Sequence, residues 1–135
     1  MTPAEAFAAL ALVAVACDGS LDREEAHSLR QQLQDRTPYR QLSEESMGAM
    51  FDALLADLRR QGWRGLLEKA LPQLTAEQQE TGLAMAAQLV HCDRIVREEE
   101  QQMLTFLAQN SALPAERSAQ ILEVIALLNR DSLAT

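Results

Sequence analysis

The chain contains one element twice, and this repeat restricts its possible folds more than any other feature of the sequence. Residues 15–25 read VACDGSLDREE and residues 90–100 read VHCDRIVREEE, at an offset of 75 positions. Between residues 9 and 34 the identical pairs are Ala9/Ala84, Ala11/Ala86, Val15/Val90, Cys17/Cys92, Asp18/Asp93, Glu24/Glu99, Glu25/Glu100, Leu29/Leu104 and Gln34/Gln109. The matches follow a helical face, then a loop, then a second helical face. Each copy is therefore predicted to be a helix-loop-helix pair, and stacking the two pairs would bury the apolar stripe of each.

The composition favours an all-helical fold. The chain has only 5 glycines and 4 prolines, while alanine, leucine, glutamine and glutamate, which are good helix formers, dominate it. Apolar residues make up 47% and charged residues 24%, a balance typical of globular proteins rather than of disordered ones. A chain of 135 residues fits one domain, over 1–135. At this length folding buries about two-thirds of the unfolded surface, so a core can form without disulfides or metals.

Capping signals and apolar periodicity divide the chain into about seven helices. The expected ranges are 3–17, 22–35, 44–60, 63–71, 75–91, 96–109 and 114–129. Asp22 with Glu25, and Thr75 with Gln78, have the spacing of capping boxes. Gly19 is expected to end the first helix, because glycine tolerates the left-handed conformation. The sequence thus predicts an all-α, single-domain bundle of two pseudo-symmetric helix-loop-helix halves.

The repeated element resembles the motif of the tellurite-resistance TerB-like family, and it is also similar to the amino-terminal domain of the DjlA co-chaperones. The resemblance rests on ACDGSLDREE at 16–25 and HCDRIVREEE at 91–100: an alanine-rich helix, Asp-Gly, an apolar residue and a Glu in the next helix. The second copy has Arg94 where the family often has glycine. The resemblance covers nearly the whole chain and implies a compact bundle of about seven helices. It also implies a role in a tellurite or stress-response system, binding a metal ion or a partner protein, and it brings no catalytic residues.

Acidic residues gather at both predicted loops and form the candidate site. The candidate metal ligands are Asp18, Asp22, Glu25, Asp93, Glu99 and Glu100. Carboxylate oxygens suit hard cations such as Ca²⁺ and Mg²⁺, and Mn²⁺ and Zn²⁺ are further candidates. If the two copies face each other, these carboxylates converge and also offer a surface for a basic partner. The alternative interpretation is helix capping and solvated charge, because acids in a first helical turn are favoured by the helix dipole. The spacing of an EF-hand is absent.

The net charge narrows the classes of partner. At −8, the chain is expected to avoid nucleic acids and anionic membrane surfaces, whereas cations and basic protein patches stay plausible. The longest uncharged apolar run, residues 6–17, is shorter than the roughly twenty residues of a spanning helix. It also lacks the basic start of a signal peptide. We therefore expect no membrane insertion, a cytoplasmic location and reduced cysteines.

No pattern in the sequence indicates catalysis. Cys17, His91 and Cys92 lack the C-x-x-C or H-x-x-x-H spacing of zinc sites. The two cysteines are interpreted as small buried residues near the contact between the repeats, with a disulfide or shared metal as the alternative. No nucleophile has a base in a recognisable motif, and no glycine-rich phosphate loop is present. The protein is predicted not to be an enzyme.

A second hypothesis is a purely structural interaction domain that binds a protein partner or itself. The last predicted helix has apolar residues on more than one face, which indicates either a central helix or a partner contact. These residues are Ile121, Leu122, Val124, Ile125, Leu127 and Leu128. Trp63 beside Arg64 has the composition of an interface hot spot. The preferred interpretation of Trp63 is nevertheless a lid that closes the core.

Overall fold

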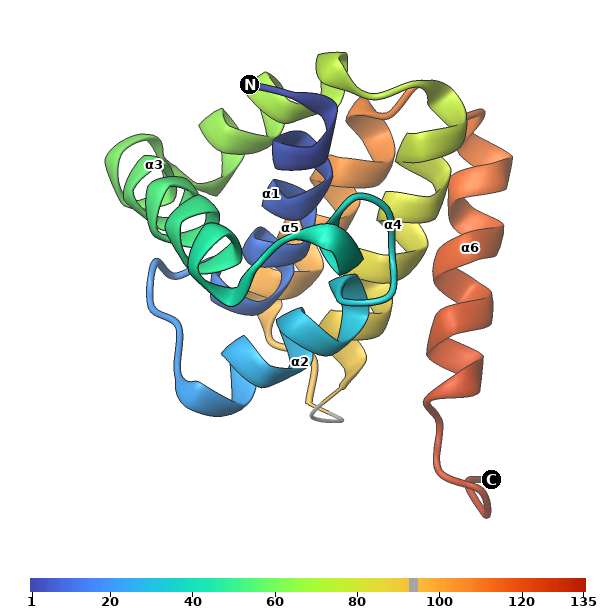
Figure 1. Ribbon diagram of the computed structural model, residues 1–135. Coiled ribbons are helices and arrows are strands. Elements are labelled where there is room, and N and C mark those ends of the chain that lie inside the picture. The colour runs from blue at the N-terminus through green and yellow to red at the C-terminus, as the bar shows by residue number, and fades with distance from the viewer. Residues whose placement is uncertain (93–94) are drawn as a thin grey trace.

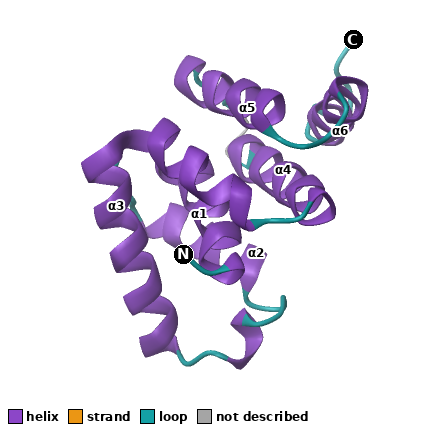
Figure 2. Ribbon diagram, turned by 90° about the horizontal axis from the view of Figure 1, so that it is seen from above, coloured by secondary structure: helices purple, strands orange, loops and turns teal. Residues whose placement is uncertain are grey.

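The computed structural model describes residues 1–92 and 95–135, and it confirms the all-α class. Over these residues it has no strands, as Figure 2 shows. The six α-helices of the described chain are α1 (Pro3–Ala16), α2 (Arg23–Leu33), α3 (Glu44–Ala70), α4 (Ala76–His91), α5 (Glu98–Asn110) and α6 (Ala115–Leu128). Two short 3₁₀ turns, η1 (Tyr39–Gln41) and η2 (Leu71–Gln73), precede α3 and α4.

The helix starts lie where the capping signals predict them. The Asp22 carboxylate accepts the backbone N–H of Glu25 at 2.8 Å, and the Glu25 carboxylate accepts that of Asp22 at 3.0 Å. The same exchange joins Thr75 and Gln78 at 3.2 and 2.9 Å. Both predicted capping boxes are therefore confirmed, and each satisfies N–H groups that have no partner within the helix.

The described residues form six α-helices where about seven are expected, and the difference lies at Gly62. The predicted helices 44–60 and 63–71 are the two arms of α3, which is interrupted by a non-helical backbone at Gly62. Gly62 has φ +76°, a conformation that residues with a Cβ adopt only with strain. The backbone is helical before and after Gly62, so the two arms form one kinked helix. The segment between the predicted helices 22–35 and 44–60 also contains regular structure, the short 3₁₀ turn η1.

Helix α1 lies at the centre of the bundle. Figure 1 shows it between α3 on one side and α4 on the other, and it contacts α2 and α5 as well. Nine of its 14 residues are buried, all of them apolar, so the helix is enclosed on every side rather than along one stripe. It approaches α4 closely at Gly82: a Cβ added there would lie 2.6 Å from Cδ1 of the fully buried Leu10. Small residues at this crossing let the two backbones approach.

The two repeated segments form neighbouring helix pairs. Helices α1 and α2 pack together, α4 and α5 pack together, and α1 packs on α4. Helix α6 lies at the edge of the molecule against α4 and α5, as both views show. No helix in the described residues has the length and apolar character that crossing a membrane requires.

A buried glutamine joins α4 to the turn before it and to the connection between α5 and α6. Gln79 is only 6% exposed, and its Nε2 donates to the carbonyls of Leu71 and Leu74 at 2.9 and 3.1 Å. Its Oε1 accepts the backbone N–H of Ala112 at 2.7 Å. One side chain therefore satisfies two carbonyl groups between α3 and α4 and one N–H group of the α5–α6 connection.

Candidate functional site

A hollow of about 260 Å³ lies where α1 and α4 end and where α2 and α5 begin. We call it the acidic hollow, and these ends lie at the bottom of Figure 1. Its lining residues are Ala14, Val15, Asp22, Glu24, Glu25, Ser28, Leu89, Val90, Cys92, Arg97 and Glu100. Four of them carry carboxylates and one carries a guanidinium group.

The acidic hollow is lined by equivalent positions of the two repeats. Four pairs of its lining residues are related by the 75-residue offset: Ala14/Leu89, Val15/Val90, Asp22/Arg97 and Glu25/Glu100. The two copies therefore meet here, and residues far apart in the sequence share one surface. The expectation that acidic residues of both copies converge holds for Asp22, Glu25 and Glu100.

The acids of the hollow also cap the helices that carry them. Besides the exchange between Asp22 and Glu25, the backbone N–H of Arg97 donates to the Glu100 carboxylate at 2.9 Å. The first copy thus has an acidic N-cap residue, whereas the second copy has a basic residue at the equivalent position. Glu24 is exposed, lines the hollow and belongs to neither of these capping pairs.

Charged groups from both copies of the repeat affect the pKa of the Glu25 carboxyl group. Burial raises the pKa of the Glu25 carboxyl group, and the neighbouring charges of Asp22 and Asp18 act in the same direction. The hydrogen bond from the backbone of Asp22 and the positive charge of Arg97 act in the opposite direction. Arg97 therefore already supplies part of the counter-charge that a bound cation would bring.

Two other predicted ligands, Asp18 and Glu99, lie outside the hollow's lining. Asp18 accepts both the backbone N–H and the hydroxyl of Ser20 at 3.0 Å, and Glu99 is exposed in the first turn of α5. Asp93 falls outside the described residues. Within 1–92 and 95–135, no three His, Cys, Asp or Glu side chains are grouped in a way that could hold a metal ion. The divalent-cation site stays a prediction.

The two cysteines differ in exposure, and neither is in a disulfide. Cys17 is partly buried, and burial, together with the charges of Glu99, Glu100 and Asp18, raises its pKa to about 11. Its thiol is therefore protonated at neutral pH. The expectation that both cysteines are buried is wrong for Cys92, because α4 ends there and the residue is exposed at the edge of the hollow.

The residues named for the second hypothesis, an interaction domain, also differ in exposure. Trp63 is 8% exposed and packs edge-to-face on Phe106, with ring centroids 5.5 Å apart, while the Arg64 guanidinium lies 4.5 Å from the Trp63 ring centroid. This arrangement confirms the lid interpretation, and the Trp63 ring offers little surface to a partner. On α6, by contrast, Val124, Leu127 and Leu128 are 60%, 55% and 71% exposed.

Two charged residues that line the acidic hollow, Glu24 and Arg97, are not among the ligands predicted from the sequence. The signal was present in the repeat itself, because the 75-residue offset pairs Arg97 with the N-cap Asp22. At this position the two copies differ in charge, because the N-cap of α2 is acidic and that of α5 is basic.

No known family model matches the chain, and no curated protein or solved structure matches it. The resemblance to TerB-like proteins therefore rests on the repeated motif alone.

Proposed function

We propose that this chain is a non-catalytic, TerB-like binding module of a tellurite or stress-response system, and that its acidic hollow takes a basic segment of a partner protein. The proposal includes an origin by duplication of one helix-loop-helix pair into two pseudo-symmetric halves. The observation that carries it is the convergence of Asp22, Glu24, Glu25 and Glu100, from both copies, on one hollow.

The size and charge of the hollow suit a single basic side chain. A volume of about 260 Å³ lies below the range of about 300–1,000 Å³ that is typical of small-molecule pockets. Lysine or arginine would form charge-assisted hydrogen bonds with the carboxylates. The net charge of −8 attracts a basic partner over longer distances and raises its association rate.

Arg97 limits this interaction, because it stands in the hollow as a competing cation. Removal of its charge should strengthen binding, and removal of an acid should weaken it. Glu24 is the best acid to test, because it is exposed and its loss leaves the Asp22–Glu25 capping box intact. Substitutions of opposite effect within one hollow separate site binding from general attraction by an acidic protein.

Titration calorimetry with a lysine- and arginine-rich peptide tests the proposal. We expect Arg97→Gln to lower the Kd and Glu24→Gln to raise it, each by about two- to fivefold, since exposed charge pairs contribute modestly. Glu123→Gln, the same charge change on exposed α6, is the matched control and should leave the Kd unchanged. High salt should weaken binding to the wild type. Equal effects of Glu24→Gln and Glu123→Gln, or no binding, would contradict the proposal.

The same titration distinguishes a divalent cation from a basic partner. Ca²⁺, Mg²⁺, Mn²⁺ and Zn²⁺ are added singly to the wild type and to Arg97→Gln. A site for an ion gives heat and a rise in Tm, because binding to the folded state alone stabilises it. If neither protein gives heat or a rise in Tm at millimolar ion, the hollow does not bind a divalent cation. The proposal of a basic peptide as the ligand would be unaffected.

A second candidate function is self-association through α6, and the exposed apolar face of that helix favours it. Val124, Leu127 and Leu128 follow the i, i+3, i+4 spacing of one helical face. A second copy that pairs along this face would cover all three. We expect sedimentation at two concentrations to show a concentration-dependent mass that Leu128→Gln abolishes. Leu42→Gln, which changes an exposed leucine outside α6, is the control. A monomer at both concentrations would contradict self-association.

A further inference from the structure

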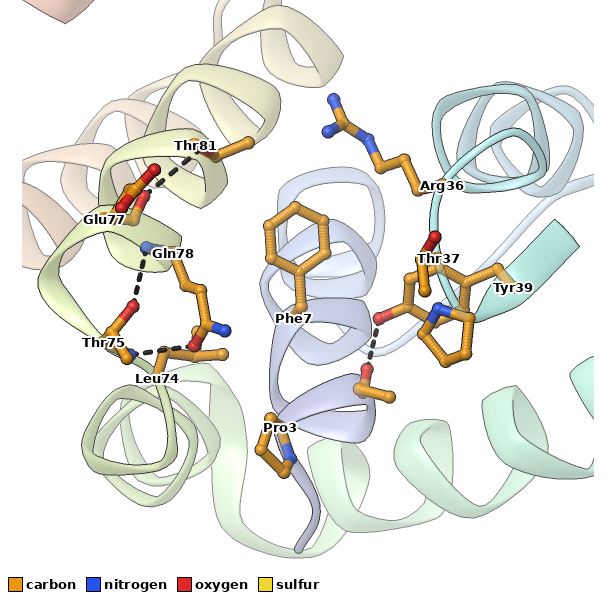
Figure 3. A pocket seen from close by; sticks show the side chains of 12 residues that line it. Pro3, Phe7, Arg36, Thr37, Tyr39, Leu74, Thr75, Glu77, Gln78 and Thr81 are labelled. Atoms are coloured by element: carbon orange, nitrogen blue, oxygen red, sulfur yellow. Dashed lines mark hydrogen bonds between the residues drawn. The ribbon is translucent and has the colours of Figure 1, made fainter.

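A larger groove, of about 850 Å³, lies at the other end of α1 from the acidic hollow. We call it the α1 groove. In Figure 3, Phe7 of α1 stands in its middle, with Arg36 and Thr37 on one side and the start of α4 on the other. Pro3, Pro38 and Leu74 complete its apolar surface. A volume of this size with a largely apolar lining and a few polar groups is typical of small-molecule sites.

Most polar groups of the α1 groove already have partners within the protein. The Tyr39 hydroxyl donates to the carbonyl of Ala4, and burial raises its pKa to about 12, so it stays protonated. Thr75 and Gln78 bond each other, as the dashed lines in Figure 3 show. The Thr81 hydroxyl donates to the Glu77 carbonyl at 3.3 Å. The charged side chains of Arg36 and Glu77 are therefore the groups that select a ligand by its polarity.

Arg36 is held in place without an acidic partner. Its Nε donates to the Gln32 carbonyl at 2.9 Å, and its guanidinium carbon lies 5.5 Å from the Phe7 ring centroid. The ion pairs found among the described residues are Arg30–Glu44, Arg60–Asp57 and Arg117–Glu80, and none includes Arg36. A planar guanidinium fixed at Nε and stacked on a ring keeps its terminal nitrogens for a carboxylate.

We propose that the α1 groove binds a small apolar monocarboxylate, with its hydrocarbon chain against Phe7 and Leu74 and its carboxylate on Arg36. Glu77 in the opposite wall disfavours a second negative charge, so a ligand with one carboxylate fits better than a dicarboxylate. Burial of the hydrocarbon chain supplies most of the binding free energy, and the arginine supplies the orientation. This ligand class is independent of the basic partner proposed for the acidic hollow.

Octanoate is the probe, and titration calorimetry with amide NMR mapping is the measurement. We expect octanoate to bind and to shift the backbone amide signals of residues that line the groove, namely Arg36, Thr37, Tyr39, Leu74, Thr75, Glu77, Gln78 and Thr81. Octanol, with the same chain length and no charge, should bind about tenfold more weakly, and Arg36→Gln should weaken octanoate to a similar degree. Arg40→Gln is the matched control, because Arg40 is exposed in η1 and does not line the groove.

Thr81→Trp provides a second variant that leaves Arg36 in place. Thr81 is exposed and lines the groove, so a tryptophan there should occupy the space of the hydrocarbon chain and abolish octanoate binding while the fold is retained. Absence of octanoate binding to the wild type would overturn the proposal. Binding that Arg36→Gln and Arg40→Gln weaken equally, or that Thr81→Trp leaves intact, would also overturn it.

Discussion

Replacement of Leu10 by alanine should lower the free energy of unfolding by about 2–5 kcal/mol. Leu10 is fully buried in the central helix α1, where its side chain meets α4. The loss combines the transfer free energy of the removed carbons with the cavity that remains. Urea denaturation followed by circular dichroism measures it, and an unchanged slope of the transition would show that the folded and unfolded states keep their compactness.

The cost of Leu10→Ala should depend on the residue at position 82. In the wild type, Gly82→Ala places a Cβ about 2.6 Å from Cδ1 of Leu10, and we expect overpacking of about 1–3 kcal/mol to outweigh the gain in helix propensity. In the Leu10→Ala background the clash is absent and the new methyl group fills part of the cavity. Gly82→Ala should then stabilise the protein.

Gly48→Ala is the control for this double-mutant cycle. A Cβ at Gly48 would have no neighbour within 4 Å, so the substitution should stabilise α3 by about 0.5–1 kcal/mol in both backgrounds. If Gly82→Ala had the same effect with Leu10 as without it, the close approach of α1 and α4 would be refuted.

The second large effect is expected at Gln79. Gln79→Met keeps the length of the side chain but leaves the carbonyls of Leu71 and Leu74 and the N–H of Ala112 without their partner. Because buried polar groups without hydrogen bonds are costly, we expect a loss of about 2–4 kcal/mol in unfolding free energy. Faster hydrogen exchange at the Ala112 amide would locate the effect in the α5–α6 connection.

Gln102→Met tests whether that loss comes from the hydrogen bonds. Gln102 lies on α5 and is exposed, so the same substitution there should change stability by no more than about 0.5 kcal/mol. Equal losses from Gln79→Met and Gln102→Met would show that the buried network does not stabilise the fold.

The helix starts could be predicted from the sequence because capping chemistry is local. Asp22 with Glu25, and Thr75 with Gln78, exchange hydrogen bonds across a single helical turn, so the spacing of the residue types is sufficient. The positive φ at Gly19 after α1 follows from a local signal of the same kind. By contrast, the apolar pattern on both sides of Gly62 is helical, and it does not show that the two arms join into one kinked α3.

The candidate site was only partly predictable. The repeat identified Asp22, Glu25 and Glu100, which line the acidic hollow, and also Asp18 and Glu99, which do not. Which carboxylates face the hollow depends on how α2 and α5 are rotated against α1 and α4, and that rotation is set by packing. The exposure of Cys92 has the same origin, because it follows from where α4 ends in the bundle.

The sequence alone predicted the helical class, the helix caps and the contact between two similar segments. These features depend on periodicity and on groups a few residues apart. Only the tertiary structure brought Arg97 beside Glu25, Gln79 beside Ala112, and Arg36 over Phe7. Each of these contacts joins different elements, and its energy depends on the positions of whole helices. Those positions result from the packing of α1 against its neighbours, to which residues along the whole chain contribute.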